Sequence, residues 1–340
     1  MLSEQQLLQI NGLTTSFRIG DDYYPAVDNL SLTVKENEVL AIVGESGCGK
    51  SALALSIMKL HQEENTKIEG EILFQGKNLV PLSLEEMNRY RGKEIGMIFQ
   101  DPMTALNPLM RVGQQIEESM KNHLQMTKEE MKNRAIDLLA KVGIPEPERT
   151  YYQYPHELSG GMRQRVVIAI AIACEPKLLI ADEPTTALDV TIQAQILDLL
   201  REMQKEMKTG IILITHDLGV VAEMADRVAV MYAGQIVEIA DVHTLFTNPL
   251  HPYTRSLFNS LPSAEHAQER LHVIQGMVPS LKNLPRHGCR FAARIPWVDE
   301  SSHEKHPQIR EVEKDHWVRC TCWQHFKFPE EAEVRNYAVT

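Results

Sequence analysis

The sequence has no apolar stretch long enough to cross a membrane. Its longest apolar run, Val166–Cys174, falls far short of the ~20 residues that a transmembrane helix needs. The first residues, Met1–Gln5, lack the basic segment and the apolar core of a secretory signal. We therefore expect a cytoplasmic protein, which partner proteins must hold in place if it acts at a membrane.

Basic charge and cysteine are also scarce. The formal net charge is −11, with 35 Lys and Arg against 46 Asp and Glu in 340 residues. This balance disfavours a general nucleic-acid binder, which needs clustered cations to neutralise phosphates.

Five cysteines in a chain of this length argue against a disulfide framework. The apolar fraction of 43% indicates a sizeable core, in one large domain with an extension or in two domains.

Hydrophobic patterning predicts an alternation of strands and helices. Strands are expected at 8–10, 30–34, 38–43, 178–181, 211–214, 228–232 and 235–238. Helices are expected at 52–58, through most of 105–160, and at 192–207. After Pro249 the periodicity weakens and prolines recur, so we place a domain boundary near residue 250.

A glycine-rich segment directly follows the predicted strand at 38–43. It reads Gly44-Glu45-Ser46-Gly47-Cys48-Gly49-Lys50-Ser51 and fits the pattern G-x-x-x-x-G-K-[ST]. The glycines let backbone N–H groups turn inward around phosphate oxygens, and the helix that follows adds partial positive charge. We expect Lys50 to reach the β- and γ-phosphates of a nucleotide and the Ser51 hydroxyl to ligate Mg²⁺.

Two carboxylates end the apolar strand predicted at 178–181. At the carboxyl end of a parallel sheet, Asp182 and Glu183 face the phosphate loop. Asp182 is expected to act on Mg²⁺ through its water shell, and Glu183 to polarise the water that attacks the γ-phosphate. The alternative interpretation is a strand followed by a solvated acidic turn. Because a phosphate loop lies upstream, this alternative is the weaker one.

The segment 158–165, Leu-Ser-Gly-Gly-Met-Arg-Gln-Arg, resembles the signature of the ATP-binding cassette family when it is combined with the phosphate loop. That resemblance implies an α/β P-loop NTPase fold with an antiparallel β subdomain, a helical signature subdomain at about 105–172 and a C-terminal extension. It also implies that Ser159, Gly160 and Gly161 close over ATP held by a second subunit. Each glycine in a helix lowers the stability of that helix by ~1 kcal/mol relative to Ala. Two glycines at this position are understandable if uncovered backbone amides must face an anion.

The same resemblance assigns roles to four further residues. Gln100, in Phe-Gln-Asp-Pro, is implied to reach the metal and the nucleophilic water and to adjoin the transmembrane contact. His216, in Ile-Thr-His-Asp, is implied to contact the γ-phosphate, and Asp189, in Ala-Leu-Asp, to bridge the two sites of the dimer. Phe17 stands where the family places an aromatic that stacks on adenine. Two nearby aromatics compete for that role, Tyr23 and Tyr24.

More narrowly, the chain resembles the peptide and nickel uptake branch of ATP-binding cassette importers, over essentially its whole length. The segments 99–108, 154–158 and 251–254 carry this resemblance, and 162–165 favours the D-type ATPase of a heterodimeric pair. The resemblance implies an ATP-binding domain at 1–250 and an extension at 251–340. It also implies a second ATPase subunit, two membrane permeases, an extracytoplasmic substrate-binding protein and a location at the cytoplasmic face of the membrane.

The extension departs from its family at a cysteine site. Similar members carry four cysteines in this region, and in some these hold an iron–sulfur cluster. Here Cys289 and Cys320 match, but Ile295 and Ser302 stand at the two intermediate positions. Because isoleucine cannot bind iron, the usual set does not provide four thiolates.

Other residues of the extension could rebuild a metal site. Cys322, together with His303 or His306, would complete a Cys₃His or Cys₂His₂ set suited to zinc. The sequence alone favours the other interpretation, in which the cluster was lost and inert thiols remain.

The leading interpretation is an ATPase that drives uptake of oligopeptides or dipeptides. A nickel or metal-chelate importer is the alternative within transport, because the loop sequences do not encode the cargo. A soluble cassette ATPase of DNA repair or translation belongs to another class, but such proteins usually carry long coiled-coil insertions or two cassettes, which this chain lacks. A regulatory protein without ATPase activity is disfavoured because all four catalytic positions are filled, by Lys50, Asp182, Glu183 and His216.

Overall fold

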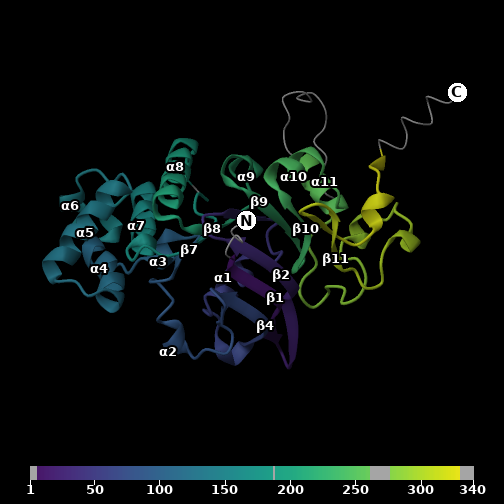
Figure 1. Ribbon diagram of the computed structural model, residues 1–340, viewed down its shortest axis with the longest axis horizontal. Helices are drawn as coiled ribbons and strands as arrows, with labels where there is room; N and C mark the ends of the chain where they lie inside the picture. Colours follow the sequence, from purple (N-terminus) through teal and green to yellow (C-terminus); the bar gives the residue numbers. More distant parts are fainter. Residues whose placement is uncertain (1–5, 187, 261–275, 330–340) are drawn as a thin grey trace.

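The computed structural model describes residues 6–186, 188–260 and 276–329 (Figure 1). The strands are β1 (Gln6–Ile19), β2 (Asp22–Lys35), β3 (Val39–Val43), β4 (Thr66–Phe74), β5 (Lys77–Asn78), β6 (Ile95–Ile98), β7 (Leu178–Asp182), β8 (Gly210–Thr215), β9 (Arg227–Tyr232), β10 (Gln235–Asp241), β11 (Ile309–Glu313) and β12 (His316–Arg319). The helices are α1 (Lys50–Ile57), α2 (Leu84–Met87), α3 (Pro102–Ala105), α4 (Val112–His123), α5 (Lys128–Lys141), α6 (Pro147–Tyr151), α7 (Gly160–Ile172), α8 (Val190–Met207), α9 (Leu218–Met224), α10 (Val242–Thr247) and α11 (Pro252–Asn259).

The larger sheet has the strand order β11-β12-β10-β9-β3-β8-β7-β6. Its central strands run parallel, from β6 through β7, β8 and β3 to β9, whereas β10, β12 and β11 pair antiparallel. All residues of β3, β7 and β8 are buried. This explains why their sequences read as continuous apolar runs, since helices or a second sheet cover both faces.

A smaller antiparallel sheet, in the order β2-β1-β4-β5, packs beside the larger one. Helix α1 belongs to the apolar cluster that joins them, because Leu53 and Ile57 share it with Leu40 and Ile42 of β3. On the opposite face of the larger sheet, Leu179 of β7 joins a cluster with α7 and α8. The larger sheet therefore lies between two layers, and the expected α/β fold with an antiparallel β subdomain is confirmed.

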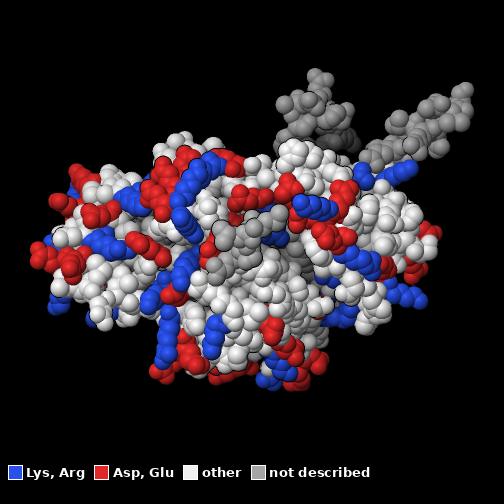
Figure 2. All heavy atoms as spheres, in the orientation of Figure 1, with Lys and Arg blue, Asp and Glu red and all other residues white. Residues whose placement is uncertain are grey.

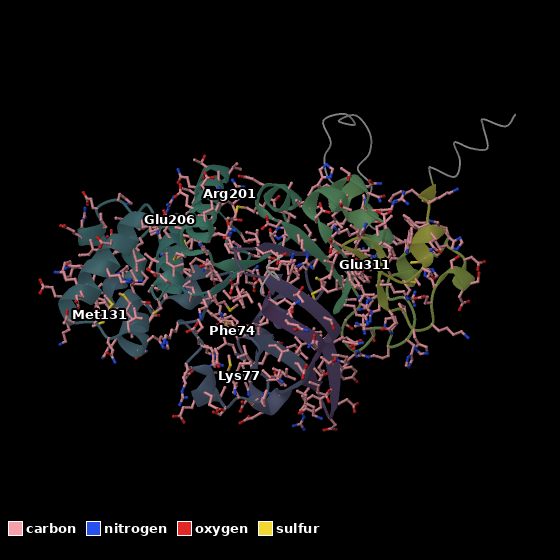
Figure 3. All side chains as sticks on the ribbon, in the orientation of Figure 1. Phe74, Lys77, Met131, Arg201, Glu206 and Glu311 are labelled. Atoms are coloured by element: carbon pink, nitrogen blue, oxygen red, sulfur yellow. The ribbon has the colours of Figure 1, made fainter. Side chains whose placement is uncertain are left out.

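Helices α3 to α7 form a separate lobe, on the left of Figure 1. Helices α4 and α6 approach closely, since a Cβ on Gly113 would lie 2.2 Å from the ring of Tyr151. Thr127 begins α5 with a capping box that includes Glu130. Lys141 of α5 pairs with Glu206 of α8, a residue labelled in Figure 3, so an ion pair also connects this lobe to the rest of the molecule.

The C-terminal extension continues the larger sheet, because β12 pairs with β10. A buried carboxylate joins the two parts. Glu238 of β10, fully buried, accepts hydrogen bonds from the backbone N–H groups of Leu250 (2.8 Å) and His251 (2.9 Å) and lies 2.8 Å from Nε2 of His316. Three hydrogen bonds compensate the loss of water around this carboxylate. Residues beyond the boundary expected near 250 therefore pack on the sheet rather than as a detached unit.

Charged side chains of both signs are interspersed on the face shown in Figure 2. No extended patch of one sign is visible on that face. Among the described residues, no helix is both long and apolar enough to span a membrane.

We predict that Glu238→Ala lowers the free energy of unfolding by about 3 kcal/mol. The substitution leaves two buried backbone donors and the ring of His316 without their acceptor, at ~1–3 kcal/mol for each unsatisfied group. Chemical denaturation of the full chain measures the change. Glu202→Ala, at an exposed position of α8, is the control and should stay within ~0.5 kcal/mol of the unsubstituted chain. Equal stability of the two variants would contradict a structural role for Glu238.

Candidate functional site

The predicted phosphate loop connects β3 to α1 in the context that its sequence requires. Gly49 has a φ of 108°, and a Cβ there would lie 2.5 Å from the carbonyl oxygen of Ala26. A Cβ on Gly44 would lie 2.2 Å from the carbonyl oxygen of Met231. Glycine is needed at both positions, because any side chain would collide with neighbouring backbone. The loop is thus held tightly against two other segments.

Lys50 extends back over this loop. Its Nζ donates hydrogen bonds to the carbonyl oxygens of Gly44 (2.7 Å) and Glu45 (3.1 Å), and its side chain is buried. A buried ammonium at the first position of a helix gives the loop concentrated positive charge. That charge, with the N-terminus of α1, suits an anionic ligand such as a phosphate.

Asp182 ends β7 and lies beside Ser51. Burial raises the pKa of the Asp182 carboxyl above its usual value, and the hydrogen bond from Ser51 opposes that rise. Its Oδ1 is buried and has no hydrogen-bond partner among the described residues. A carboxylate oxygen with free coordination capacity next to a hydroxyl is a donor set that fits a hard divalent cation.

Glu183 is surrounded by polar groups from the ends of neighbouring strands. Its Oε2 accepts hydrogen bonds from Nε2 of Gln100 and from the Thr186 hydroxyl, each at 2.9 Å. Its Oε1 lies 3.4 Å from Nδ1 of His216. The residue has a φ of 48°, and its N–H donates to the carbonyl oxygen of Ile214. The structure therefore brings together three predicted residues, Gln100, Glu183 and His216.

The predicted signature forms the start of α7, in the helical lobe. The Ser159 hydroxyl caps the helix by accepting from the N–H of Met162 at 3.3 Å. Ser159 and Gly160 are exposed, and a Cβ on Gly160 would meet no atom within 4 Å. The N-terminus of α7 is thus open on the outside of this chain.

Asp189 begins α8, and its carboxylate accepts from the N–H of Ile192 at 2.9 Å. Ile192 in turn lies beside the signature, since a Cβ on Gly161 would be 3.2 Å from its side chain. Ala187, which belongs to the same predicted loop, lies outside the described residues.

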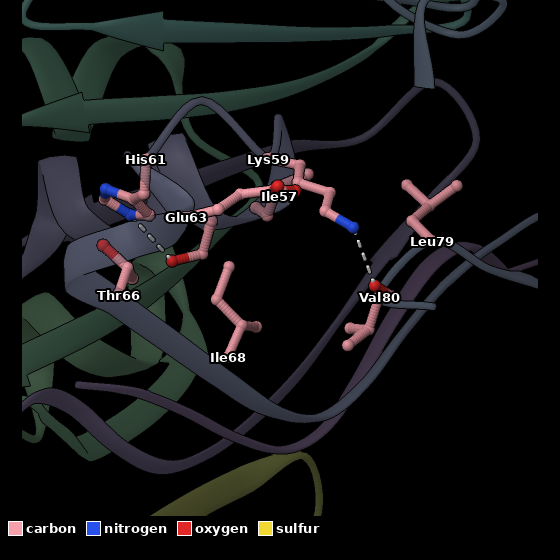
Figure 4. Close-up of a pocket in the computed structure, with 9 residues that line it drawn as sticks. Ile57, Lys59, His61, Glu63, Thr66, Ile68, Leu79 and Val80 are labelled. Atoms are coloured by element: carbon pink, nitrogen blue, oxygen red, sulfur yellow. Dashed lines mark hydrogen bonds between the residues drawn. The ribbon is translucent and has the colours of Figure 1, made fainter. Parts of the chain in front are cut away.

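Phe17 lies on β1, half-buried, with its ring edge-on to His61 at 5.0 Å between centroids. The competing tyrosines contact cations instead: Lys67 lies over Tyr23, and Arg286 over Tyr24. A pocket beside His61 is lined by residues from the end of α1 and from β4, and Lys59 donates to the carbonyl oxygen of Val80 there (Figure 4). None of the residues 44–51 lines this pocket, so it is distinct from the phosphate loop.

Three residues outside the predicted set complete the surroundings of the site. Thr186 contacts Glu183. Tyr253 accepts a hydrogen bond at its hydroxyl from the N–H of Glu45 (2.7 Å), and Arg294 pairs with the Glu45 carboxylate (2.5 Å). Thr186 and Tyr253 lie within or near segments that the sequence singles out. Arg294 has no local signal, because its partner is 249 positions away.

Comparison with known families finds two matches. Residues 27–186 match the family model described as ABC transporter. Residues 237–300 match the model described as the oligopeptide/dipeptide transporter C-terminal region. The two matched regions cover the phosphate loop, the signature, the carboxylate pair and part of the extension.

Curated relatives match almost the whole chain. The oligopeptide transport ATP-binding protein OppD of Lactococcus lactis subsp. cremoris is 51% identical over 331 residues, which cover 97% of this chain and 98% of that protein. OppD of Bacillus subtilis is 53% identical over 321 residues, covering 94% and 89%. A putative peptide import ATP-binding protein of Brucella melitensis is 49% identical over 335 residues, covering 95% and 99%.

Solved structures agree with the fold. The dimeric structure of MJ0796, a bacterial ABC transporter cassette, has a TM-score of 0.63 and 30% identity, covering 69% of this chain and 98% of that one. A post-hydrolysis dimer of the same cassette, bound to ADP and Pi, has a TM-score of 0.63 and 29% identity with the same coverage. From its motifs, its fold and these relatives, the chain belongs to the ABC transporter family, as an ATPase subunit.

Proposed function

We propose that this chain is the ATP-hydrolysing subunit of an importer of oligopeptides or dipeptides. The observation that carries the ATPase assignment is the cluster around Glu183, at the edge of the sheet where the phosphate loop also begins. The peptide substrate is supported by the match to the oligopeptide/dipeptide C-terminal region and by relatives named for oligopeptide transport.

Each residue of the candidate site has a separate role in the proposed hydrolysis step. Lys50 and the amides of the phosphate loop bind the β- and γ-phosphates. Ser51, Asp182 and Gln100 would hold Mg²⁺, which supplies neutralisation of the developing phosphate charge. Glu183 orients and polarises the attacking water.

The neighbours of Glu183 act on its position and on the γ-phosphate. Gln100 and Thr186 fix one carboxylate oxygen of Glu183 through hydrogen bonds of 2.9 Å. His216, more than half exposed, is free to contact the γ-phosphate. The carboxylate of Glu183 is thus held by groups of its own chain, which is the arrangement that positioning catalysis requires.

A second ATPase subunit would complete the site. Ser159, Gly160 and Gly161 lie at an open helix N-terminus, which offers partial positive charge and bare amides to an anion outside this chain. We propose that they close over ATP held by an unlike partner subunit, while the partner's signature covers the nucleotide bound here. Asp189 would bridge the two sites, and Phe17 would stack on adenine.

Membrane partners follow from the same assignment. The relatives are named as ATP-binding proteins of peptide transport, so we propose two permease subunits and an extracytoplasmic substrate-binding protein as partners. The chain would then lie at the cytoplasmic face of the membrane, with Gln100 and the helical lobe near the permease contact. Closure of the ATPase dimer on ATP would drive the permease, and hydrolysis would reopen it.

We predict that Glu183→Gln lowers the ATPase rate of the assembled transporter by about 10²-fold or more while ATP binding persists. The amide keeps the size of the side chain and an acceptor oxygen for Gln100 and Thr186, but it cannot polarise water. Steady-state phosphate release and nucleotide binding measure the two effects. Glu202→Gln, the same chemical change at an exposed position of α8, is the control. An unchanged rate would remove Glu183 as the catalytic group.

The same variant tests the transported substrate. In cells whose only copy carries Glu183→Gln, uptake of labelled dipeptides and oligopeptides should be lost, while uptake of nickel and of a sugar continues. Loss of nickel uptake alone would assign the chain to metal import. Persistence of all uptake would refute the proposed function.

We predict that Gly160→Glu slows hydrolysis in the assembled transporter without destabilising this chain. The structure leaves open space for the side chain, and an acidic residue in the first turn favours a helix. The new carboxylate would repel a γ-phosphate presented by the partner, at a cost of about 10²-fold in rate, comparable to removing one oriented N–H donor. Thermal unfolding and ATP binding of the isolated chain should remain unchanged. Full ATPase activity in the assembled transporter would contradict the role proposed for the signature.

A further inference from the structure

Four potential metal ligands meet in the C-terminal extension. Cys289, His303, Cys320 and Cys322 place one ligand atom each within 4.8 Å of all the others. They come from three separate segments, around 289, around 303 and at the end of β12. We propose that these four side chains bind a single zinc ion, independently of which solute the transporter carries.

The four side chains are oriented toward one another. Cys320 and Cys322 are buried, and the three thiols form hydrogen bonds among themselves. The Nδ1 atom of His303 is buried and has no hydrogen-bond partner among the described residues. An orphaned imidazole nitrogen beside three clustered thiols is explained if a metal ion occupies the space between them.

Backbone hydrogen bonds hold the three segments in place. The N–H of Gly288 donates to the carbonyl oxygen of Lys305 at 2.9 Å. The N–H of Glu304 donates to Sγ of Cys320 at 3.5 Å, and the hydroxyl of Thr321 donates to the carbonyl oxygen of Ser302 at 3.3 Å. N–H groups that donate to sulfur are the kind of outer contact that orients and tunes a metal ligand. The ligands are therefore preorganised by the fold itself.

The spacing of the ligand atoms suits one ion. Tetrahedral zinc, with Zn–S bonds of about 2.3 Å, holds its ligand atoms about 3.8 Å apart. The present spread of up to 4.8 Å needs only a small contraction to reach that geometry. A cluster of several irons would instead push its ligands farther apart. A mixed set of thiolates and one imidazole in a closed site is also typical of structural zinc.

Neither residue at the two expected cysteine positions, Ile295 and Ser302, offers a thiolate. Ile295 is buried in an apolar cluster with Phe291 and Val298. Ser302 carries a hydroxyl, and its carbonyl oxygen accepts a hydrogen bond from the hydroxyl of Thr321. In the proposed site, His303 and Cys322 supply the two ligands that these positions do not.

The second candidate histidine lies outside this set. The ring of His306 is edge-on to His287, 6.0 Å away between centroids. Of the alternatives raised by the sequence, the described residues therefore favour Cys₃His with His303. His306 becomes a control, because it is a histidine of the same loop that should not bind the ion.

The proposed ion would stabilise a contact with the phosphate loop. Directly after Cys289, Arg290 pairs with Asp28, and Arg294 pairs with Glu45 of the loop. A ligand bond at Cys289 anchors the segment that carries both arginines. Loss of zinc should therefore loosen the extension against the ATP site as well as lower the stability of the chain.

Metal analysis of the full chain is the first test. The reduced protein, incubated with Zn²⁺ and desalted, should retain one zinc per chain and no acid-labile sulfide. Co²⁺ in place of Zn²⁺ should give the intense thiolate-to-cobalt absorption of a tetrahedral site. Retention of no zinc, or iron together with sulfide, would overturn the proposal.

Substitutions separate ligands from neighbours. Cys289→Ser, Cys322→Ser and His303→Ala should each weaken zinc binding more than about tenfold. His303→Cys should restore it, because thiolate can replace imidazole as a ligand, whereas a packing role would not be rescued in this way. His306→Ala and Cys174→Ser should bind zinc like the unsubstituted chain. Equal loss in the His306 and His303 variants would refute the assignment.

Thiol protection tests the site without any substitution. In the unsubstituted chain, Zn²⁺ should slow alkylation of Cys289, Cys320 and Cys322, and a chelator should reverse this. Labelling of Cys174, which follows α7, should not respond to Zn²⁺, since it does not belong to the cluster. Protection of all five cysteines alike would indicate general tightening of the fold and would contradict a defined site.

Discussion

Parallel pairing of β3 with β8, and of β8 with β7, places the ends of these strands at one edge of the larger sheet. Val43 lies opposite Thr215, and Asp182 opposite Ile214, so the phosphate loop, the carboxylate pair and His216 leave the sheet at adjacent points. A slip of one residue would reverse the faces of every side chain in a strand. Because all residues of these strands are buried, such a slip would disrupt the core on both sides. The register of the core therefore also sets the geometry of the candidate site.

The extension is connected to this same edge. Tyr253 and Arg294 hold the backbone and the side chain of Glu45, a position that the phosphate-loop pattern leaves open to any residue. Glu238 joins the start of the extension to β10 from within the core. Contacts of this kind let the conformation of the extension influence the nucleotide loop, and the proposed zinc ion would strengthen them.

In the proposed mechanism, the site within one chain is only half of what hydrolysis needs. Glu183 is already held by Gln100, Thr186 and His216, whereas Ser159 and Gly160, at the N-terminus of α7, are exposed. This division explains why one ATPase subunit would not hydrolyse ATP without its partner. Hydrolysis would follow only when two chains meet, so that ATP consumption is tied to movement of the permease.

The sequence by itself determined the class of the protein, the ATP-site motifs and most of the central strands and helices. Those features are local. An apolar run such as 211–214, or the eight-residue motif from Gly44 to Ser51, can be recognised from neighbouring residues alone. The contact of Arg294 with Glu45, the antiparallel addition of β12 to β10 and the convergence of His303, rather than His306, on three cysteines were decided only by the tertiary structure. Each joins residues far apart in the chain or depends on the direction of a side chain. Neither property leaves a periodic pattern in the sequence, because packing of the whole core brings these groups together.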